Sequence, residues 1–251
     1  MKLSVVIVTQ DEEANIGGTL ESVSWAEERI VLDSGSTDRT VEIARSLGAK
    51  VFSEPWKGYG AQKNSAIEKA CGDWVLSLDA DEAVEPALAE EIKAILRDGS
   101  KLNAYWIPRK NFFLGRWMRH GGFYPDRKLR LFRRGTGCFQ ERFVHETLQV
   151  EGGTGTLTNA LIHNAYPTLE KYLHTMNRYS SLGAEIAVAE GHGGFSIINI
   201  MLRPNLTFFY NYIFRLGFLD GREGLLLHLY HAHYVSWKYA KAWEKSRTAK
   251  R

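Results

Sequence analysis

The first hundred residues alternate between short apolar runs and helical stretches, and this alternation restricts the fold more than any other feature. The run "LSVVIV" (3–8) is continuously apolar and β-branched, as in a strand buried on both faces. Similar strand-like runs occur at 29–33, 50–54 and 73–79, and helical stretches lie between them at 15–25, 39–48 and 60–72. Strands that alternate with helices form a parallel, doubly wound sheet with right-handed crossovers. The sequence therefore predicts an α/β fold.

Polar residues stand where three of these strands end. Thr9 follows the first strand, Asp33 closes the second, and Asp79 and Asp81 follow the fourth. In open α/β sheets, ligands bind at the carboxyl ends of the strands. We therefore expect these side chains to belong to one binding site.

The stretch "LSLDADEAVEP" (76–86) places three acids within four positions after an apolar run. Carboxylates crowded in this way repel one another, and apolar neighbours make their charge harder to solvate. A hard divalent cation, Mg²⁺ or Mn²⁺, suits such a D-x-D and would bridge to a diphosphate. The alternative is that Asp81 and Glu82 favour the dipole of the helix that follows.

Composition narrows the class of protein. Cys71 and Cys138 cannot build a disulfide framework, which favours a reducing compartment, and the net charge of +3 is too small to indicate nucleic-acid binding. The first apolar run is too short for a signal peptide, and no window has the roughly 20 apolar residues that span a bilayer. We expect a soluble or surface-bound protein.

The second half of the chain has a different character. Aromatic-rich extended segments run from about residue 103 to 166, and a helical pattern begins at 168. Apolar segments at 195–218 and 222–243 carry basic residues, and the chain is strongly basic from Ser236 onward. Such helices suit the membrane interface; a packed helical cap or a dimer surface is the alternative. We divide the chain into domains at 1–166 and 167–251.

The segment "LHLYHAHY" holds three histidines that invite a metal interpretation. At helical spacing His228 and His231 share a face, whereas His233 lies away from both. The pattern therefore argues against a metal site there. His120 and His163 have no partner motif, and we interpret them as structural.

Longer motifs bring in a family resemblance. The segments "VVIVTQDEEANI", "IVLDSGSTDRTVEIA" and "GYGAQKNSAIEKACGDWVLSLDADE" resemble, in order and spacing, the nucleotide-sugar motifs of inverting family 2 glycosyltransferases with the GT-A fold. These motifs cover about residues 1–100, the expected nucleotide-sugar half, and leave about 101–166 as the acceptor half. Later segments such as "GGFYPDRKLRLFRR", "FVHETL" and "LGFLDGREGLLL" resemble bacterial lipopolysaccharide-core β-1,4-glucosyltransferases of the WaaE/KdtX type.

The resemblance implies a role for each strand-end residue. Thr9 and Glu12 would hold the nucleoside, and the Asp33 carboxylate would accept from uracil N3–H. Lys63, which replaces an arginine usual in the family, would supply a cation to the nucleotide or diphosphate. Asp79 would contact ribose or a metal-bound water, and Asp81 would ligate the metal. Plain alternatives are that Thr9 only ends a strand, Asp33 forms an Asx-turn and Lys63 is a solvated helical lysine.

Inversion at an anomeric carbon needs one base that takes the proton of the attacking hydroxyl. The base must lie across the anomeric carbon from the diphosphate, so we expect it in the later segment. Glu146 is the favoured candidate and Asp126 the alternative. Asp126 neighbours Arg127, Lys128 and Arg130, and a salt bridge there would lower its basicity. Arg130, Arg133 and Arg134 suit acceptor phosphates or an exposed strand face.

Taken with the resemblance, these features predict transfer of a sugar from a UDP-sugar, UDP-glucose being the expected donor, to a heptose of the lipopolysaccharide inner core. Such an enzyme would lie on the cytoplasmic face of the inner membrane. Transfer to polyprenyl phosphate or another cell-surface glycan is the alternative. A third hypothesis is a non-catalytic sugar-binding protein. A dinucleotide dehydrogenase would need G-x-G-x-x-G after the first strand, and "TQDEEANI" lacks it.

Overall fold

A computed structural model describes residues 1–140 and 147–248. The chain divides into two compact units, and each is described by itself. The first unit combines Met1–Arg109 with Arg127–His163, and the second combines Lys110–Asp126 with Asn164–Arg251.

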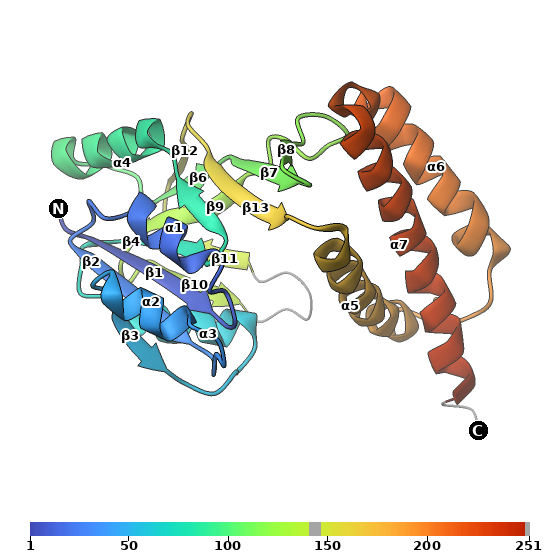
Figure 1. Ribbon diagram of the computed structural model, residues 1–251, viewed down its shortest axis with the longest axis horizontal. Coiled ribbons are helices and arrows are strands. Elements are labelled where there is room, and N and C mark those ends of the chain that lie inside the picture. Colours follow the sequence, from blue (N-terminus) through green and yellow to red (C-terminus); the bar gives the residue numbers. More distant parts are fainter. Residues whose placement is uncertain (141–146, 249–251) are drawn as a thin grey trace. The chain divides into compact units, whose positions relative to one another are not determined.

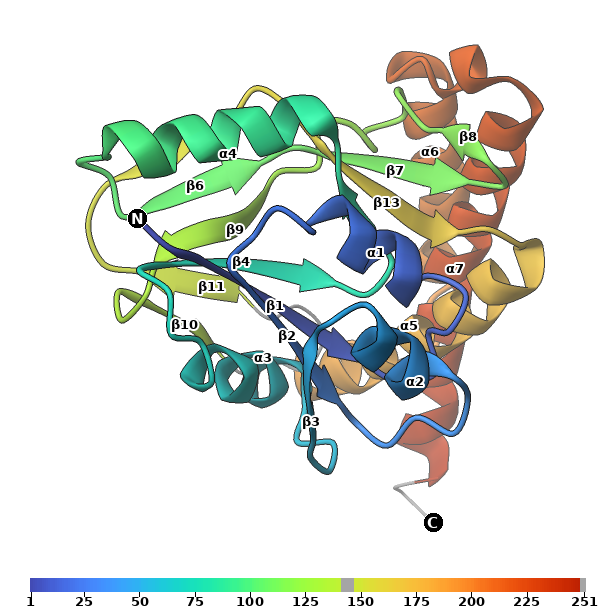
Figure 2. The same ribbon diagram turned by 60° about the vertical axis from the view of Figure 1, so that its left-hand side comes forward.

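The first unit is built on a seven-stranded mixed sheet in the order β12-β6-β9-β4-β1-β2-β3 (Figures 1 and 2). Its strands are β1 (Leu3–Thr9), β2 (Glu28–Asp33), β3 (Lys50–Ser53), β4 (Trp74–Asp79), β6 (Ala104–Ile107), β9 (Lys128–Arg133) and β12 (Thr154–Thr156). The first four strands pair in parallel, as the alternation predicts. Strand β9 is antiparallel to both β4 and β6, which makes the sheet mixed.

Helices cover both faces of this sheet because β1 and β4 are apolar on both sides. The helices are α1 (Ile16–Ser22), α2 (Thr40–Ser46), α3 (Tyr59–Glu68) and α4 (Pro86–Asp98). Leu3, Val5 and Ile7 share one core cluster with apolar residues of α1, α2 and α4. Val6 points to the other side, into a second cluster with Ala66 of α3. Alternate side chains of one strand thus enter opposite cores.

Smaller strands complete the structure. In the first unit β10 (Gly137–Gln140) pairs with β11 (Thr147–Val150), and β5 (Glu82–Val84) pairs with the start of β13 (Leu161–Tyr166). In the second unit β7 (Arg109–Phe113) pairs with β8 (Arg116–Trp117). Strands β7 and β13 each run along the chain from the first unit into the second.

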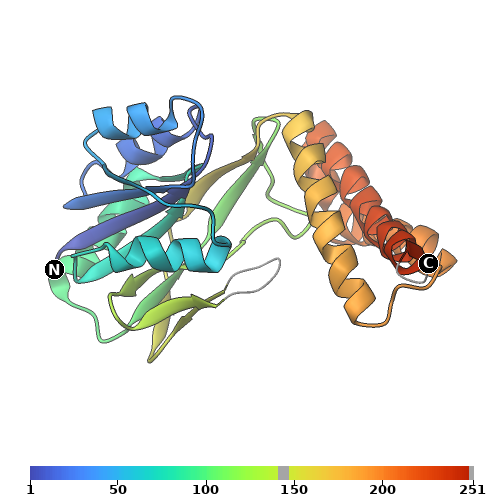
Figure 3. The ribbon, with the colours of Figure 1, turned by 90° about the horizontal axis from the view of Figure 1, so that it is seen from below.

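The second unit is mainly helical. Its elements are α5 (Leu169–Ala189), η1 (Ile198–Leu202), α6 (Arg203–Phe209), η2 (Tyr210–Phe214), η3 (Gly217–Asp220) and α7 (Gly221–Thr248). Helices α5 and α7 pack side by side, as Figure 3 shows, around a core that includes Phe113, Tyr172 and Leu227. Lys245 pairs with Glu185 at 2.7 Å along the same contact. In the described ranges 1–140 and 147–248, every helix is too short or too polar to cross a bilayer.

His228 of α7 is a buried residue of the second unit. Its imidazole is 1% exposed, and neither ring nitrogen has a hydrogen-bond partner among the described residues. The ring lies against Gly121 and Gly217 so closely that a Cβ at either glycine would meet it, and it contacts Phe123 edge-on. Burial, together with the charge of His231, lowers the pKa of His228 to about 4. His228 is therefore a packed, neutral histidine.

Candidate active site

Three of the predicted site residues meet at one edge of the sheet. Strands β1, β2 and β4 are neighbours, and in their register Thr9 lies beside Asp33 while Val8 lies beside Asp79. Because these strands are parallel, their carboxyl ends coincide. The structure thus brings Thr9, Asp33 and Asp79 together at the carboxyl ends of the strands, where α/β sheets bind ligands.

Asp33 forms the Asx-turn that the sequence allowed. Its carboxylate accepts hydrogen bonds from the backbone N–H of Gly35 at 3.0 Å and of Ser36 at 3.2 Å. Gly35 has φ +96°, a conformation that residues with a Cβ rarely adopt. The turn fixes the orientation of a carboxylate whose residue is only 3% exposed.

Two buried hydroxyls next to Asp33 have no hydrogen-bond partner among the residues that the structure describes. The Oγ1 of Thr9 and the Oγ of Ser34 are inaccessible to solvent, and neither has a hydrogen-bond partner within the described part of the chain. The backbone N–H of Ser34 donates to the carbonyl oxygen of Thr9 at 3.0 Å, so both hydroxyls belong to one strand-end pair. An unsatisfied buried hydroxyl costs about 1–3 kcal/mol. Such groups at a strand end are suited to a polar ligand.

Glu12 lies in a loop that is hydrogen-bonded to the loop after β2. Its N–H donates to Thr40 Oγ1 at 2.8 Å, and its Oε2 accepts from Asn15 Nδ2 at 2.6 Å. Further bonds between the two loops join Asp11 with Ser36 and Thr37, Glu13 with Asp38, and Arg39 with Glu13. Asp11 itself has φ 51°, in the left-handed region. The two loops therefore form one hydrogen-bonded layer.

Asp79 is surrounded by cations. Lys63 of α3 places its Nζ 2.8 Å from Oδ1, Arg130 of β9 pairs with Oδ2, and Arg109 Nη1 lies 3.9 Å from Oδ2. Lys63 is 3% exposed and Arg130 4% exposed, so neither is the solvated surface residue that the sequence allowed.

The same cations determine the ionisation of Asp79. Burial by itself would raise the pKa of the carboxyl, but the charges of Arg130, Lys63 and Arg109 hold it well below its usual range. Asp79 therefore stays ionised at physiological pH. The carboxylates in turn raise the pKa of Arg130, whose guanidinium is permanently charged.

Glu82 is a member of this cluster that the sequence did not assign to the site. Its side chain is fully buried, and its Oε1 accepts from Arg109 Nη1 and Arg130 Nη2, each at 2.9 Å. Its Oε2 accepts from the backbone N–H of Asp79 at 2.9 Å. Glu82 thus fixes both arginines beside Asp79. The only sequence signal for it was its place among three closely spaced acids.

Asp81 faces a histidine instead of Asp79. Its Oδ2 lies 3.5 Å from Nε2 of His163, on β13. His163 was interpreted as structural from the sequence, so its place beside the second acid of the D-x-D is a new observation. Among the described residues, no group of three or more His, Cys, Asp or Glu side chains has the geometry of a metal site.

Of the two candidate bases, the structure describes Asp126 alone. Glu146 lies outside the described residues. Asp126, in the second unit, accepts a hydrogen bond from Asn111 Nδ2 at 3.2 Å. The assignment of the base remains a prediction from the sequence.

An α/β sheet with charged side chains gathered past the carboxyl ends of its parallel strands has the arrangement in which doubly wound folds bind their ligands. The family model described as glycosyl transferase family 2 matches residues 4–160. The chain belongs to this family and is a glycosyltransferase.

Relatives extend the match beyond the sheet. The lipopolysaccharide core biosynthesis glycosyltransferase LpsC of Rhizobium meliloti (strain 1021) is 31% identical over 198 residues, which cover 76% of this chain and 73% of the relative. An uncharacterized glycosyltransferase of Rickettsia bellii (strain RML369-C) is 33% identical over 239 residues, covering 90% of this chain and 80% of the relative.

A solved structure supports the fold. S. aureus TarS 1-349, in complex with UDP-GlcNAc, aligns with a TM-score of 0.50 and 15% identity, covering 99% of this chain and 92% of that chain. At this identity the likeness shows the fold alone. The predicted GT-A fold with a helical C-terminal region is confirmed.

Proposed function

We propose that this protein is an inverting hexosyltransferase that moves glucose from UDP-glucose to a heptose of the lipopolysaccharide inner core, as enzymes of the WaaE/KdtX type do. The cluster of Lys63, Arg130 and Asp79 at the end of β4 carries the proposal, because it combines fixed positive charge with an ionised carboxylate where a nucleotide sugar would bind. Similarity to LpsC, named for lipopolysaccharide core biosynthesis, supports the acceptor class.

The donor would bind along the carboxyl ends of β1, β2 and β4. Thr9 and Glu12 would hold the nucleoside, with the unpartnered Thr9 hydroxyl available to a polar group, and Asp33 would accept from uracil N3–H. Lys63 would balance the charge of the diphosphate, and Asp79 would contact the ribose. Lys63 and Arg130 are both held by Asp79 before the donor binds, so the site needs little reorganisation on binding.

A divalent cation, Mg²⁺ or Mn²⁺, fits Asp81 better than Asp79. Both oxygens of Asp79 are paired with cationic side chains, whereas Asp81 has an imidazole nitrogen 3.5 Å away. Mg²⁺ in nucleotide sites takes one or two carboxylates together with phosphate oxygens and water. We therefore assign Asp81 as the metal ligand, with His163 beside it and Asp79 in the surrounding shell. The cation would neutralise charge on the leaving diphosphate.

In the transfer, the acceptor hydroxyl oxygen bonds to the anomeric carbon, the bond from that carbon to the diphosphate oxygen breaks, and UDP leaves. The hydroxyl proton passes to a carboxylate, for which we propose Glu146. Glu146→Gln keeps the shape of the side chain and removes its basicity, so turnover should fall by a factor of about 10² to 10⁴ while UDP-sugar affinity is unchanged. Asp126→Asn is the matched variant. A folded, inactive Asp126→Asn beside an active Glu146→Gln would reverse the assignment.

The acceptor is lipid-linked, so the enzyme would work at the cytoplasmic face of the inner membrane. The domain 167–251 would provide the contact with the membrane surface. The decisive experiment incubates the protein with a panel of UDP-sugars and with truncated core lipopolysaccharides, measuring UDP release and the product. Transfer from UDP-glucose to a heptose-terminated core is expected. Transfer to polyprenyl phosphate alone, or no transfer with any pair, would reject the proposal.

A further inference from the structure

The second unit exposes apolar surface in one segment. Of the 18 large hydrophobic side chains that are exposed in the described part of the chain, 13 lie between residues 195 and 219. Phe214 is 77% exposed, Ile197 is 64% exposed and Phe195 is 63% exposed. Scattered exposed apolar residues are ordinary, but a contiguous patch of this kind marks an interaction surface. We call the exposed side of η1, α6 and η2 the α6 face.

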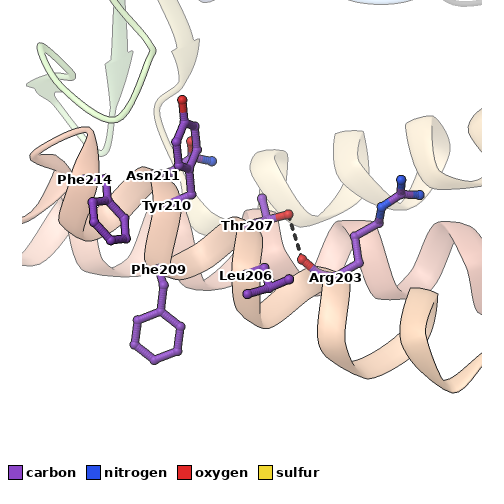
Figure 4. Close-up of a pocket in the computed structure, with 7 residues that line it drawn as sticks. All are labelled: Arg203, Leu206, Thr207, Phe209, Tyr210, Asn211 and Phe214. Carbon is purple, nitrogen blue, oxygen red and sulfur yellow. Dashed lines mark hydrogen bonds between the residues drawn. The ribbon is translucent and has the colours of Figure 1, made fainter.

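The α6 face is built along a continuous helical run. The π-helical turns η1 and η2 flank α6 on both sides, so the run extends from Ile198 to Phe214. Its inner side packs on α7, where Ser236 Oγ donates to the carbonyl oxygen of Ile200 at 2.8 Å. Figure 4 shows Phe209 pointing away from this run. The apolar side chains are therefore outward because the helix is anchored on its other side.

The charge of this segment has one sign. Between Glu190 and Asp220 the sequence has no Asp or Glu, while it has Arg203 and Arg215. Arg203, whose guanidinium contacts Tyr239 of α7, lines an open hollow of about 520 Å³ along this run together with Leu206, Phe209 and Phe214 (Figure 4). Apolar side chains with basic neighbours and no acids match a surface of apolar acyl chains beneath anionic phosphates.

Polar side chains of α6 donate hydrogen bonds to backbone carbonyl oxygens of the same helical run. Thr207 Oγ1 donates to the carbonyl oxygen of Arg203 at 2.8 Å, and Asn205 Nδ2 donates to the carbonyl oxygen of Met201 at 2.7 Å. Each of these donors is satisfied by the helix itself. This arrangement lowers the cost of moving the face out of water, because a donor in an apolar medium needs a partner.

We infer that the α6 face embeds in the interfacial layer of a membrane that contains anionic lipids. A second copy of the chain is a poorer occupant. In a two-fold contact through this face both partners use the same patch, and between Glu190 and Asp220 the segment offers no acid to neutralise Arg203 and Arg215 of the other copy. The inference rests on the proposed function, which supplies the lipid-linked acceptor. It adds to that function by assigning the membrane contact to residues 195–219 in preference to the basic end of the chain.

The test measures flotation of the full chain with phosphatidylcholine vesicles, with and without phosphatidylglycerol. Phe209→Glu/Phe214→Glu should weaken vesicle binding by about 100-fold, roughly tenfold for each partly exposed ring that no longer enters the lipid. Phe52→Glu, an exposed aromatic in the first unit, is the matched control and should bind as the wild type does. Arg203→Gln and Arg215→Gln should each cost about fivefold on anionic vesicles and nothing on phosphatidylcholine alone.

Circular dichroism and sedimentation velocity of the same proteins separate the outcomes. The inference is overturned if the folded double variant floats as the wild type does, or if it only converts a wild-type dimer into a monomer. Transfer to a deacylated core oligosaccharide tests the enzyme apart from the membrane. If Phe209→Glu/Phe214→Glu loses vesicle binding and keeps this transfer activity, the result supports membrane binding by the α6 face. Flotation without transfer to any acceptor would reject the proposed function and leave the membrane surface standing.

Discussion

The buried imidazole of His228 gives the second unit a pH dependence whose size follows from its surroundings. Burial and the charge of His231 lower its pKa from 6.5 to about 4, so the unfolded chain takes up a proton at a higher pH than the folded chain. Stability is therefore complete above about pH 6.5 and is lost as the pH falls towards 4. One pKa unit corresponds to about 1.4 kcal/mol, so the loss reaches about 2 kcal/mol at pH 5.

The variant His228→Leu removes this titration and keeps an apolar side chain in the site. Urea unfolding is followed by far-ultraviolet circular dichroism, to which the second unit contributes strongly because α5 and α7 have 21 and 28 residues. Between pH 8 and pH 5 the free energy of unfolding should fall by about 2 kcal/mol less in this variant than in the wild type. His233→Leu replaces an exposed histidine of the same helix, and its free energy of unfolding should fall by as much as that of the wild type. Equal losses in His228→Leu and wild type would show that His228 does not cause the loss of stability in acid.

Three further predictions concern the active site. Asp33→Ala should weaken UDP binding by about 1–3 kcal/mol through the lost nucleoside hydrogen bond, and unchanged affinity by calorimetry would remove Asp33 from the donor site. Asp81→Ala should abolish metal-dependent UDP release in a folded protein; full activity of this variant in EDTA would contradict a metal role. Glu82→Gln should lower the free energy of unfolding by about 3 kcal/mol, because Arg109 and Arg130 keep their buried charge and lose one of the two carboxylates that neutralise it. A wild-type urea midpoint for Glu82→Gln would show that the arginines are balanced in another way.

The parallel part of the sheet could be predicted from local pattern. Expected strands at 3–8, 29–33, 50–54 and 73–79 correspond to β1, β2, β3 and β4, each within one residue at either end. The continuous β-branched runs and the helical stretches between them are local signals, and the parallel direction of the strands follows from their alternation. The meeting of Thr9, Asp33 and Asp79 was predictable for the same reason.

The partners of the acids were not predictable, because they depend on which distant strands pair. Arg130 reaches Asp79 only because β9 inserts antiparallel beside β4, and His163 reaches Asp81 only because β13 pairs with β5. Nothing in the local sequence of either strand specifies that register. From the sequence, Arg130 was interpreted as a residue that binds acceptor phosphates or lies on an exposed strand face. Pairing across the sheet converts it into a buried counterion.

The hydrogen-bonded layer formed by the loops after β1 and β2 limits how the proposed donor site can be redesigned. Asp11 holds Thr37, and Glu13 receives a bond from Arg39 while its own N–H donates to Asp38. A graft that replaces one loop would leave the other with unmatched donors and acceptors, so effects of substitutions across the layer should be non-additive. Residues 10–15 and 34–40 should therefore be exchanged together in any redesign of the proposed donor site.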